Sequence, residues 1–120
     1  MSEKPHRRLI VWQRAMNLIE TIYRLTERFP KEEPFGLVAQ LRRAAVSVAS
    51  NIAEGAARHT AKEQAQFFYI ARGSISELDT QIEISYRPRF LNGEQRQETV
   101  DDLNEVGRLL SGLIASKRGL

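Results

Sequence analysis

Residues 40–58 read QLRRAAVSVASNIAEGAAR, and this stretch decides the fold class. Its apolar residues recur at steps of three and four, which places them on one face of an α-helix. Leu37 extends the same face, and Pro34 stands where a proline suits the first turn of a helix. Gly55 marks the end of the pattern. We therefore predict a helix over residues 35–57.

An earlier segment, residues 8–29, carries apolar residues at the same spacing. Phe29-Pro30 ends this predicted helix, because a proline disfavours helical geometry in the residue before it. Val11, Leu18 and Leu25 widen its apolar stripe. The face that we expect in the core consists of Trp12, Ala15, Met16, Ile19, Ile22 and Tyr23.

Two further helices are predicted over residues 61–87 and 93–117. Thr60-Ala-Lys-Glu63 is a capping-box pattern, in which the hydroxyl and the carboxylate can each bond a free backbone amide. Asn92-Gly-Glu-Gln95 can cap the last helix. Short linkers between long helices favour antiparallel neighbours. The predicted fold is therefore all-α, an antiparallel up-down-up-down four-helix bundle that forms a single domain over residues 1–120.

The composition excludes several classes of protein. The chain has 120 residues and no cysteine, so it has no disulfide, no thiolate metal site and no cysteine nucleophile. A reducing compartment fits such a chain, and we expect a cytoplasmic location. The apolar run near the N-terminus is too short for a signal peptide, and no stretch approaches the roughly 18 uncharged apolar residues of a membrane span. We expect no association with a membrane.

Basic residues are concentrated in the first half of the sequence. Residues 1–62 contain eleven arginine and lysine residues against six acids, whereas residues 63–120 contain seven against nine. Arginine supplies 14 of the 18 basic residues, and its side chain forks onto phosphate and stacks on bases. A polyanion is therefore a candidate partner. The alternative is a mixed surface full of helix ion pairs.

Five arginines are the candidate nucleic-acid-binding residues. Arg42 and Arg43 project away from the predicted core side of their helix. They could join Arg7, Arg8 and Arg14 in one basic surface that binds phosphates. The aromatic residues sit mostly at core spacing, so neither base stacking nor sequence-specific readout is indicated. The alternative is that Arg42 and Arg43 pair with carboxylates across an interface.

Polar residues follow the edge of the apolar face within residues 40–58, where the third helix can reach them. We predict a hydrogen-bonded seam that fixes the register of the two helices. No histidine or lysine lies near enough in sequence to activate Ser47 or Ser50, so we expect no enzyme activity. The predicted seam consists of Ser47, Asn51, Glu54, Arg58, Ser74 and Glu77.

Metal and cofactor sites are not indicated. His6 and His59 lack the histidine or carboxylate neighbours of a helical metal site. The glycines are scattered singly, so no glycine-rich phosphate loop is present. We expect neither a metal nor a cofactor.

The third predicted helix is apolar on a second side. Tyr69, Gly73, Thr80 and Ile84 fall on a stripe well away from the expected core face. In a monomeric bundle such a surface is partly exposed to solvent, and self-association would cover it. We therefore predict a homo-oligomer with this stripe as its interface. A broader core within one monomer is the alternative.

Several motifs give the chain a family resemblance. Trp12-Gln-Arg-Ala15, Phe29-Pro30, residues 40–58 and the IARGSISELDTQI of residues 70–82 resemble the four-helix-bundle proteins known as 23S rRNA intervening-sequence proteins. The resemblance covers nearly the whole chain. Its most specific element is Asn51-Ile-Ala-Glu-Gly55.

The resemblance implies a bundle that assembles as a ring-shaped homopentamer. A relative is the accessory variability determinant of diversity-generating retroelements, a basic bundle that engages nucleic acid and a reverse transcriptase. Some relatives are encoded inside insertions within 23S rRNA genes, a genetic context that suggests a link to RNA. One departure is Ser85-Tyr-Arg-Pro-Arg-Phe-Leu91, which replaces the more usual leucine-glycine-tyrosine turn.

Two hypotheses from different classes follow. The first is a non-catalytic, homo-oligomeric binding module that binds nucleic acid, RNA before DNA, through Arg-rich surfaces. The alternative is a protein–protein interaction adaptor or scaffold. An enzyme would need a concave polar site that the sequence does not supply.

Overall fold

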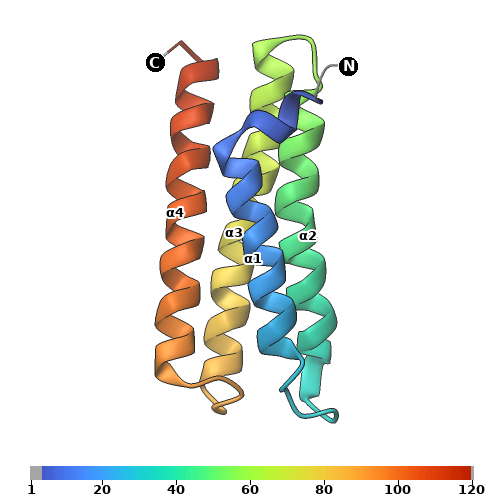
Figure 1. The fold of residues 1–120 in the computed structure, drawn as a ribbon, viewed down its shortest axis with the longest axis vertical. Coiled ribbons are helices and arrows are strands. Elements are labelled where there is room, and N and C mark those ends of the chain that lie inside the picture. The colour runs from blue at the N-terminus through green and yellow to red at the C-terminus, as the bar shows by residue number, and fades with distance from the viewer. Residues whose placement is uncertain (1–3, 120) are drawn as a thin grey trace.

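The computed structural model describes residues 4–119, and within them the chain forms four long helices and no strand. The helices are α1 (Ile10–Thr26), α2 (Leu37–Ala56), α3 (Ala61–Tyr86) and α4 (Gly93–Lys117), with short 3-10 helices η1 (Pro5–Arg8) and η2 (Pro34–Gly36) before α1 and α2. They run alternately down and up (Figure 1), so the predicted all-α, antiparallel four-helix bundle is confirmed. Residues 1–3 and 120 of the predicted domain lie outside the described range.

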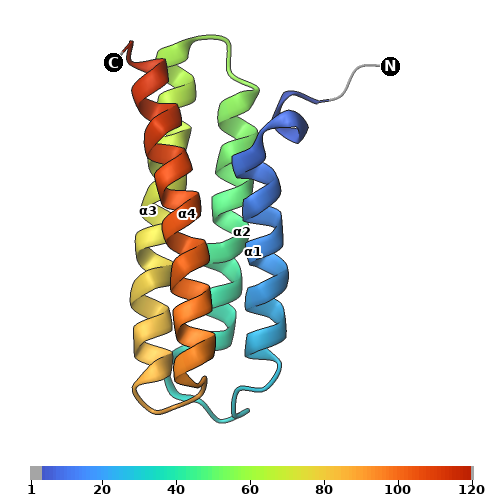
Figure 2. The ribbon, with the colours of Figure 1, turned by 60° about the vertical axis from the view of Figure 1, so that its left-hand side comes forward.

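The helices are arranged so that each packs against two others, in the cyclic order α1, α2, α3, α4 (Figures 1 and 2). The contact between α2 and α3 is the most extensive and that between α1 and α4 the least. Both chain ends and the α2–α3 connection lie at one end of a bundle 44 Å long (Figure 1). The α1–α2 and α3–α4 connections lie at the other end.

The first helix is shorter than the predicted range of residues 8–29. Leu9 is extended, with φ −77° and ψ 125°, and separates η1 from α1. At the other end α1 stops at Thr26, and the chain turns through Phe29, whose ring packs against that of Phe90 at 5.5 Å between centroids.

The start of α2 is set by two left-handed residues. Phe35 has φ 72° and Gly36 has φ 60°, so the regular helix begins at Leu37 and not at residue 35. The carboxylate of Glu33 then accepts hydrogen bonds from the backbone N–H groups of Leu37 and Val38, at 3.0 and 3.2 Å. This carboxylate supplies the N-terminal cap that the sequence pattern did not predict.

The two predicted caps differ in completeness. The Thr60 hydroxyl accepts from the Glu63 N–H at 3.1 Å, but the Glu63 carboxylate accepts from that hydroxyl at 3.0 Å and not from a backbone amide. Only half of this capping box therefore forms. Asn92 and Gln95 form the complete box, with both reciprocal bonds at 2.8 Å.

The buried face of α1 is rotated from the predicted one. Val11 and Leu18 are buried in the core, whereas Met16 and Tyr23 are exposed. Helix α1 carries apolar residues around most of its circumference, so the 3.6-residue period alone leaves its orientation open. The apolar face predicted for α2 is buried as expected, whereas Phe67 on α3 and Val100 and Leu113 on α4 are half-buried. Within residues 4–119, none of the helices combines the length and apolarity that crossing a membrane requires.

Candidate nucleic-acid interface

Charge is divided between the two ends of the bundle. Cutting each long helix near its midpoint gives a termini half, residues 4–18, 47–73 and 105–119, and a turn half, residues 19–46 and 74–104. The termini half contains ten basic and three acidic residues, a net charge of +7. The turn half contains eight basic and eleven acidic residues, a net charge of −3. The bundle is therefore electrostatically polar along its axis.

The structure does not bring the five predicted arginines together. Arg7 and Arg8 lie on η1, at the end of the termini half. Arg14 lies on α1, lining a cavity between α1 and α4. Arg42 and Arg43 lie on the first turns of α2, in the turn half, so the 44 Å bundle separates them from η1 (Figure 1).

Arg42 and Arg43 also differ from each other. The Arg42 Nε donates to Thr26 Oγ1 at 2.9 Å, and its guanidinium lies 4.3 Å from the centroid of the Tyr23 ring. Arg42 is therefore a structural link between α2 and α1. Arg43 is exposed, and its side chain forms no hydrogen bond, ion pair or ring contact with any described residue.

Sequence reasoning missed several cations of the termini half. Arg58 and Lys62 flank the α2–α3 connection, while Lys117 and Arg118 end α4. The predicted topology would have placed these cations together. An up-down-up-down bundle brings the starts of its first and third helices to the ends of its second and fourth helices. The ten basic residues of this half are Lys4, Arg7, Arg8, Arg14, Arg58, Lys62, Arg72, Arg108, Lys117 and Arg118.

Contacts within the termini half leave part of this charge unpaired. Arg58 forms an ion pair with Glu54 at 2.6 Å, and Arg108 pairs with Glu105 at 2.8 Å and lowers the pKa of that carboxyl below its usual value. Arg118 donates to the Tyr69 hydroxyl at 2.8 Å, so its hydrogen-bond partner is an uncharged group. The side chains of Lys4, Lys62 and Lys117 form no hydrogen bond or ion pair with another described residue.

The predicted polar seam is reduced to one bond between α2 and α3. Ser47 Oγ and Ser74 Oγ lie 3.0 Å apart, and Asn51 Nδ2 donates to the carbonyl and hydroxyl oxygens of Ser47 at 2.9 and 3.1 Å. Glu54 pairs with Arg58 on the exposed surface of α2, one helical turn away. These two residues stand outside the seam because they are placed on the solvent side.

Glu77 likewise bonds within its own helix. Its carboxylate accepts from Gln81 Nε2 at 3.2 Å, so it does not reach α2. Gln81 itself is buried, and among the described residues no donor reaches its Oε1.

The predicted oligomer stripe is exposed along α3. Tyr69 and Ile84 are 38% and 41% exposed, and Gly73 and Thr80 lie between them on the same surface. Ile70, which the sequence analysis left out, is 52% exposed beside Tyr69.

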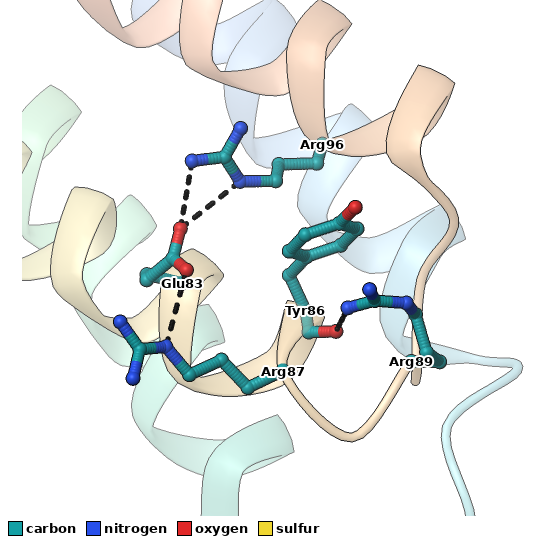
Figure 3. Close-up of polar contacts among 5 residues, drawn as sticks. All are labelled: Glu83, Tyr86, Arg87, Arg89 and Arg96. Carbon is teal, nitrogen blue, oxygen red and sulfur yellow. Dashed lines mark hydrogen bonds and ion pairs between the residues drawn. The ribbon is translucent and has the colours of Figure 1, made fainter.

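A cluster of ion pairs and ring contacts lies at the α3–α4 connection (Figure 3). Arg96 of α4 donates through Nε and Nη2 to Glu83 Oε1 at 3.0 and 2.7 Å, and Arg87 donates to Glu83 Oε2 at 3.3 Å. The Arg96 bond, then that of Arg87, lowers the pKa of Glu83 below its usual value. The Tyr86 ring lies near Arg89 and Arg96, at 4.1 and 5.0 Å from their Cζ atoms. Glu83 offsets one of the three arginine charges, and its bonds with Arg96 link α3 to α4.

Three cavities lie in the groove between α1 and α4, and another of about 450 Å³ lies between α3 and α4. The largest, about 500 Å³, lies in the turn half between residues 21–28 and 95–102. A second of about 240 Å³ is lined by Arg14 and Glu105, and a third of about 390 Å³ lies between residues 9–11 and 108–116. Among residues 4–119, no cluster of three or more side chains of the kind that bind a metal occurs.

Comparison with known proteins identifies a family. The sequence profile of the family described as 23S rRNA-intervening sequence protein matches residues 7–112. A crystal structure of a protein of unknown function from the S23 ribosomal protein family of Bacteroides thetaiotaomicron superposes with a TM-score of 0.81. The two chains are 22% identical, and the match covers 88% of this chain and 98% of that one, which shows a shared fold. No protein with a curated description matches the sequence.

Proposed function

Because the chain belongs to the family of 23S rRNA-intervening sequence proteins, we propose that it is a non-catalytic, homo-oligomeric module that binds nucleic acid, and RNA in particular. The observation that carries this proposal is the +7 net charge of the termini half. A polyanion gains most of its affinity from such a surface by releasing condensed counterions. The cysteine-free chain fits the reducing cytoplasm, where RNA is abundant.

The surface favours recognition of charge and shape over recognition of bases. Arginine side chains at this end are partly engaged by aromatic rings, since Arg58 stacks on Phe67 at 4.7 Å and Arg7 lies 5.6 Å from the Trp12 centroid. These rings are thus covered by cations from their own chain and offer no open platform for base stacking. Phosphate contacts from exposed lysines and arginine forks would position the nucleic acid.

Self-association supports the same role. The exposed stripe of Tyr69, Gly73, Thr80 and Ile84 leaves apolar surface that no packing within one monomer covers. Each added copy repeats the positive half, so weak phosphate contacts act together and raise the overall affinity.

The test is a titration of labelled RNA at several salt concentrations with two matched triple variants. The first, Arg7→Gln with Lys62→Gln and Lys117→Gln, removes three charges from the termini half. Each phosphate that is no longer neutralised should flatten the plot of log affinity against log salt by about 0.7 for a single strand, or about 2 in total.

The control variant removes the same charge from the turn half by Arg28→Gln, Lys31→Gln and Arg43→Gln. It should bind RNA nearly as tightly as the unmodified protein. If instead the control loses as much affinity, RNA binding is not specific to the termini half. If neither variant changes a salt-dependent affinity, or no RNA binds at low salt, the proposed function is wrong.

A protein-binding adaptor is the second candidate, and Phe35 favours it. This side chain is 76% exposed, the most exposed large apolar residue among residues 4–119, and its backbone has the unfavourable φ of 72°. The carbonyl of Phe35 accepts from Gln40 Nε2, which helps to hold the loop in place. A partner retained in high salt and released by Phe35→Ser would favour the adaptor over RNA binding.

A further inference from the structure

A small cavity lies at the positive end of the bundle, where both chain ends and the α2–α3 connection come together (Figure 1). Its walls come from η1, the end of α2, the start of α3 and the end of α4. Most of the lining is apolar and consists of Pro5, Leu9, Ala56, Phe68 and Leu113. Phe68 is buried, so its ring is a fixed part of the wall.

Two polar side chains complete the lining, and each keeps an unused hydrogen-bonding group. Gln64 Nε2 donates to the Arg58 carbonyl at 3.0 Å, which leaves Gln64 Oε1 as an acceptor that no described residue uses. The Lys117 ammonium likewise forms no hydrogen bond or ion pair with a described residue. An apolar hollow with a few placed polar groups is the usual form of a small-molecule site.

The volume of the cavity, about 130 Å³, limits what can enter. An apolar protein cavity of about 150 Å³ holds one benzene molecule. A single six-membered ring therefore fits, whereas the two fused rings of a purine exceed the space.

The charge around the cavity indicates which ring compound would enter. The cavity lies in the termini half, whose net charge is +7, and Lys62 and Arg118 stand on elements that form its walls. A neutral aromatic compound gains nothing from that charge, whereas a nucleotide within a polyanion does. Trp12 and Phe67, the neighbouring aromatic residues, are covered by arginines, so this cavity is where a base can make apolar contact.

We propose that this cavity receives one unstacked pyrimidine base of a bound single strand. The inference rests on the proposed function, because the surrounding cations hold the phosphates on either side of the inserted nucleotide. The N3–H of uracil, or the amino group of cytosine, can donate to Gln64 Oε1, and a carbonyl oxygen of either base can accept from Lys117. The cavity then selects by ring size, which agrees with a surface that reads shape.

The same geometry favours single strands over duplexes. A base in a duplex must be unpaired and unstacked before it can enter, which costs free energy that a single strand does not lose. A duplex should therefore bind through its phosphates alone.

Three short labelled chains of equal length and charge test the insertion with the unmodified protein: oligouridylate, oligoadenylate and a chain of abasic ribose phosphates. They share the electrostatic part of the affinity and differ in what can enter the cavity. Oligouridylate should bind about tenfold more tightly than the abasic chain, within the range that contact of one base with an aromatic ring contributes. It should also bind more tightly than oligoadenylate.

Ala56→Leu tests whether this difference arises in the cavity. Leucine fills the space, suits the helix and leaves every charge in place. The variant should bind the abasic chain as the unmodified protein does, and bind oligouridylate no more tightly than that chain. Ala57→Leu is the matched control, because residue 57 is exposed and lies outside the lining, so it should keep the preference for oligouridylate. Circular dichroism checks that both variants stay helical.

The outcomes separate this inference from the proposed function. Equal, salt-dependent affinity for oligouridylate and the abasic chain would overturn the pyrimidine cavity and leave the proposed function standing. A preference for oligouridylate that survives in folded Ala56→Leu, or oligoadenylate bound as tightly as oligouridylate, would also overturn the cavity. The comparison of the three chains needs no variant, so it decides even where Ala56→Leu fails to fold. If none of the three chains binds at low salt, the proposed function itself is wrong, and the inference with it.

Discussion

The guanidinium of Arg42 lies 4.3 Å from the centroid of the Tyr23 ring, which joins the start of α2 to the end of α1. The same side chain donates to Thr26 Oγ1 at 2.9 Å and to the Tyr23 carbonyl at 3.5 Å. Thr26 in turn donates to the Ile22 carbonyl at 2.7 Å, inside the core. Arg42, which the sequence suggested as a phosphate-binding residue, therefore holds α1 and α2 together.

The first prediction separates these roles by substitution at adjacent positions. Arg42→Ala removes the stacking interaction and the bond to Thr26, so the free energy of unfolding should fall by about 1–2 kcal/mol. Arg43→Ala, at an exposed position, should change it by less than about 0.5 kcal/mol. Urea denaturation at one protein concentration measures both. Equal stability of the two variants would contradict the structural role of Arg42.

Apolar periodicity was enough to predict the helices and their order, because each segment carries a face several turns long. It was not enough to orient α1. Trp12, Met16 and Tyr23 follow the same spacing as Val11 and Leu18, and only the position of α2 decides which side is buried. Arg42 covers Tyr23, which lets an exposed aromatic residue stand at that boundary.

The candidate site was predictable only in part. Arg7 and Arg8 do lie in the positive half, but the sequence order groups them with Arg42 and Arg43, which antiparallel folding carries to the other end. Counting charges by bundle end, using the predicted topology, would have separated them. The φ value of Phe35 could not be predicted, since a bulky residue rarely adopts that conformation.

The second prediction concerns Glu83 and pH. Its pKa is lowered in the folded protein by the bond from Arg96 and then by that from Arg87. A carboxylate of this kind adds stability at pH values above its unfolded pKa, and the contribution disappears as pH falls through the folded pKa. Glu83→Gln should therefore lower stability at neutral pH and flatten the decline of stability in acid. Chemical denaturation across that pH range measures the slope.

The control for this effect is Glu20→Gln, an acid whose side chain forms no hydrogen bond or ion pair with any other described residue. It should leave the acid slope unchanged. Some pH dependence should persist in Glu83→Gln, because Arg108 also lowers the pKa of Glu105. An acid slope in Glu83→Gln as steep as that of the unmodified protein would show that the Arg96 link does not contribute.

The third prediction concerns the backbone at the end of α3. Arg89 has φ 66°, and its N–H bonds the Tyr86 carbonyl at 2.8 Å while the Phe90 N–H bonds the Ser85 carbonyl at 3.0 Å. This pair of bonds is a Schellman motif, in which the left-handed position favours glycine. Here an arginine occupies the left-handed position, so its backbone is strained.

Arg89→Gly should relieve that strain and raise the free energy of unfolding by about 1 kcal/mol, less the amount that the packing of Arg89 on Tyr86 contributes. Arg89→Ala also removes this packing but keeps the unfavourable φ, so it should be less stable than the unmodified protein. In thermal denaturation, Arg89→Gly should be the most stable, the unmodified protein intermediate and Arg89→Ala the least stable. If Arg89→Ala were as stable as Arg89→Gly, the backbone at this position would not be strained.

The last prediction explains the glycine of the Asn51-Ile-Ala-Glu-Gly55 motif. A Cβ atom at Gly55 would lie 2.7 Å from Phe68 Cε1 and 3.0 Å from Phe67 Cβ, because α2 and α3 approach closely there. Phe68 is buried, so its ring has little room to move. Gly55→Ala should therefore lower the free energy of unfolding by about 1–3 kcal/mol, although alanine favours the helix itself.

Gly107 provides the matched control, since a Cβ there would find its nearest neighbour, Ile75 Cγ2, at an ordinary 3.7 Å. Gly107→Ala should raise stability by about 0.5–1 kcal/mol through helix propensity. Combining Gly55→Ala with Phe68→Leu tests the cause, because a smaller side chain at 68 removes the clash and should make the double variant more stable than the sum of the single effects. Additive effects, or a Gly55→Ala variant as stable as Gly107→Ala, would show that close approach of α2 and α3 does not require this glycine.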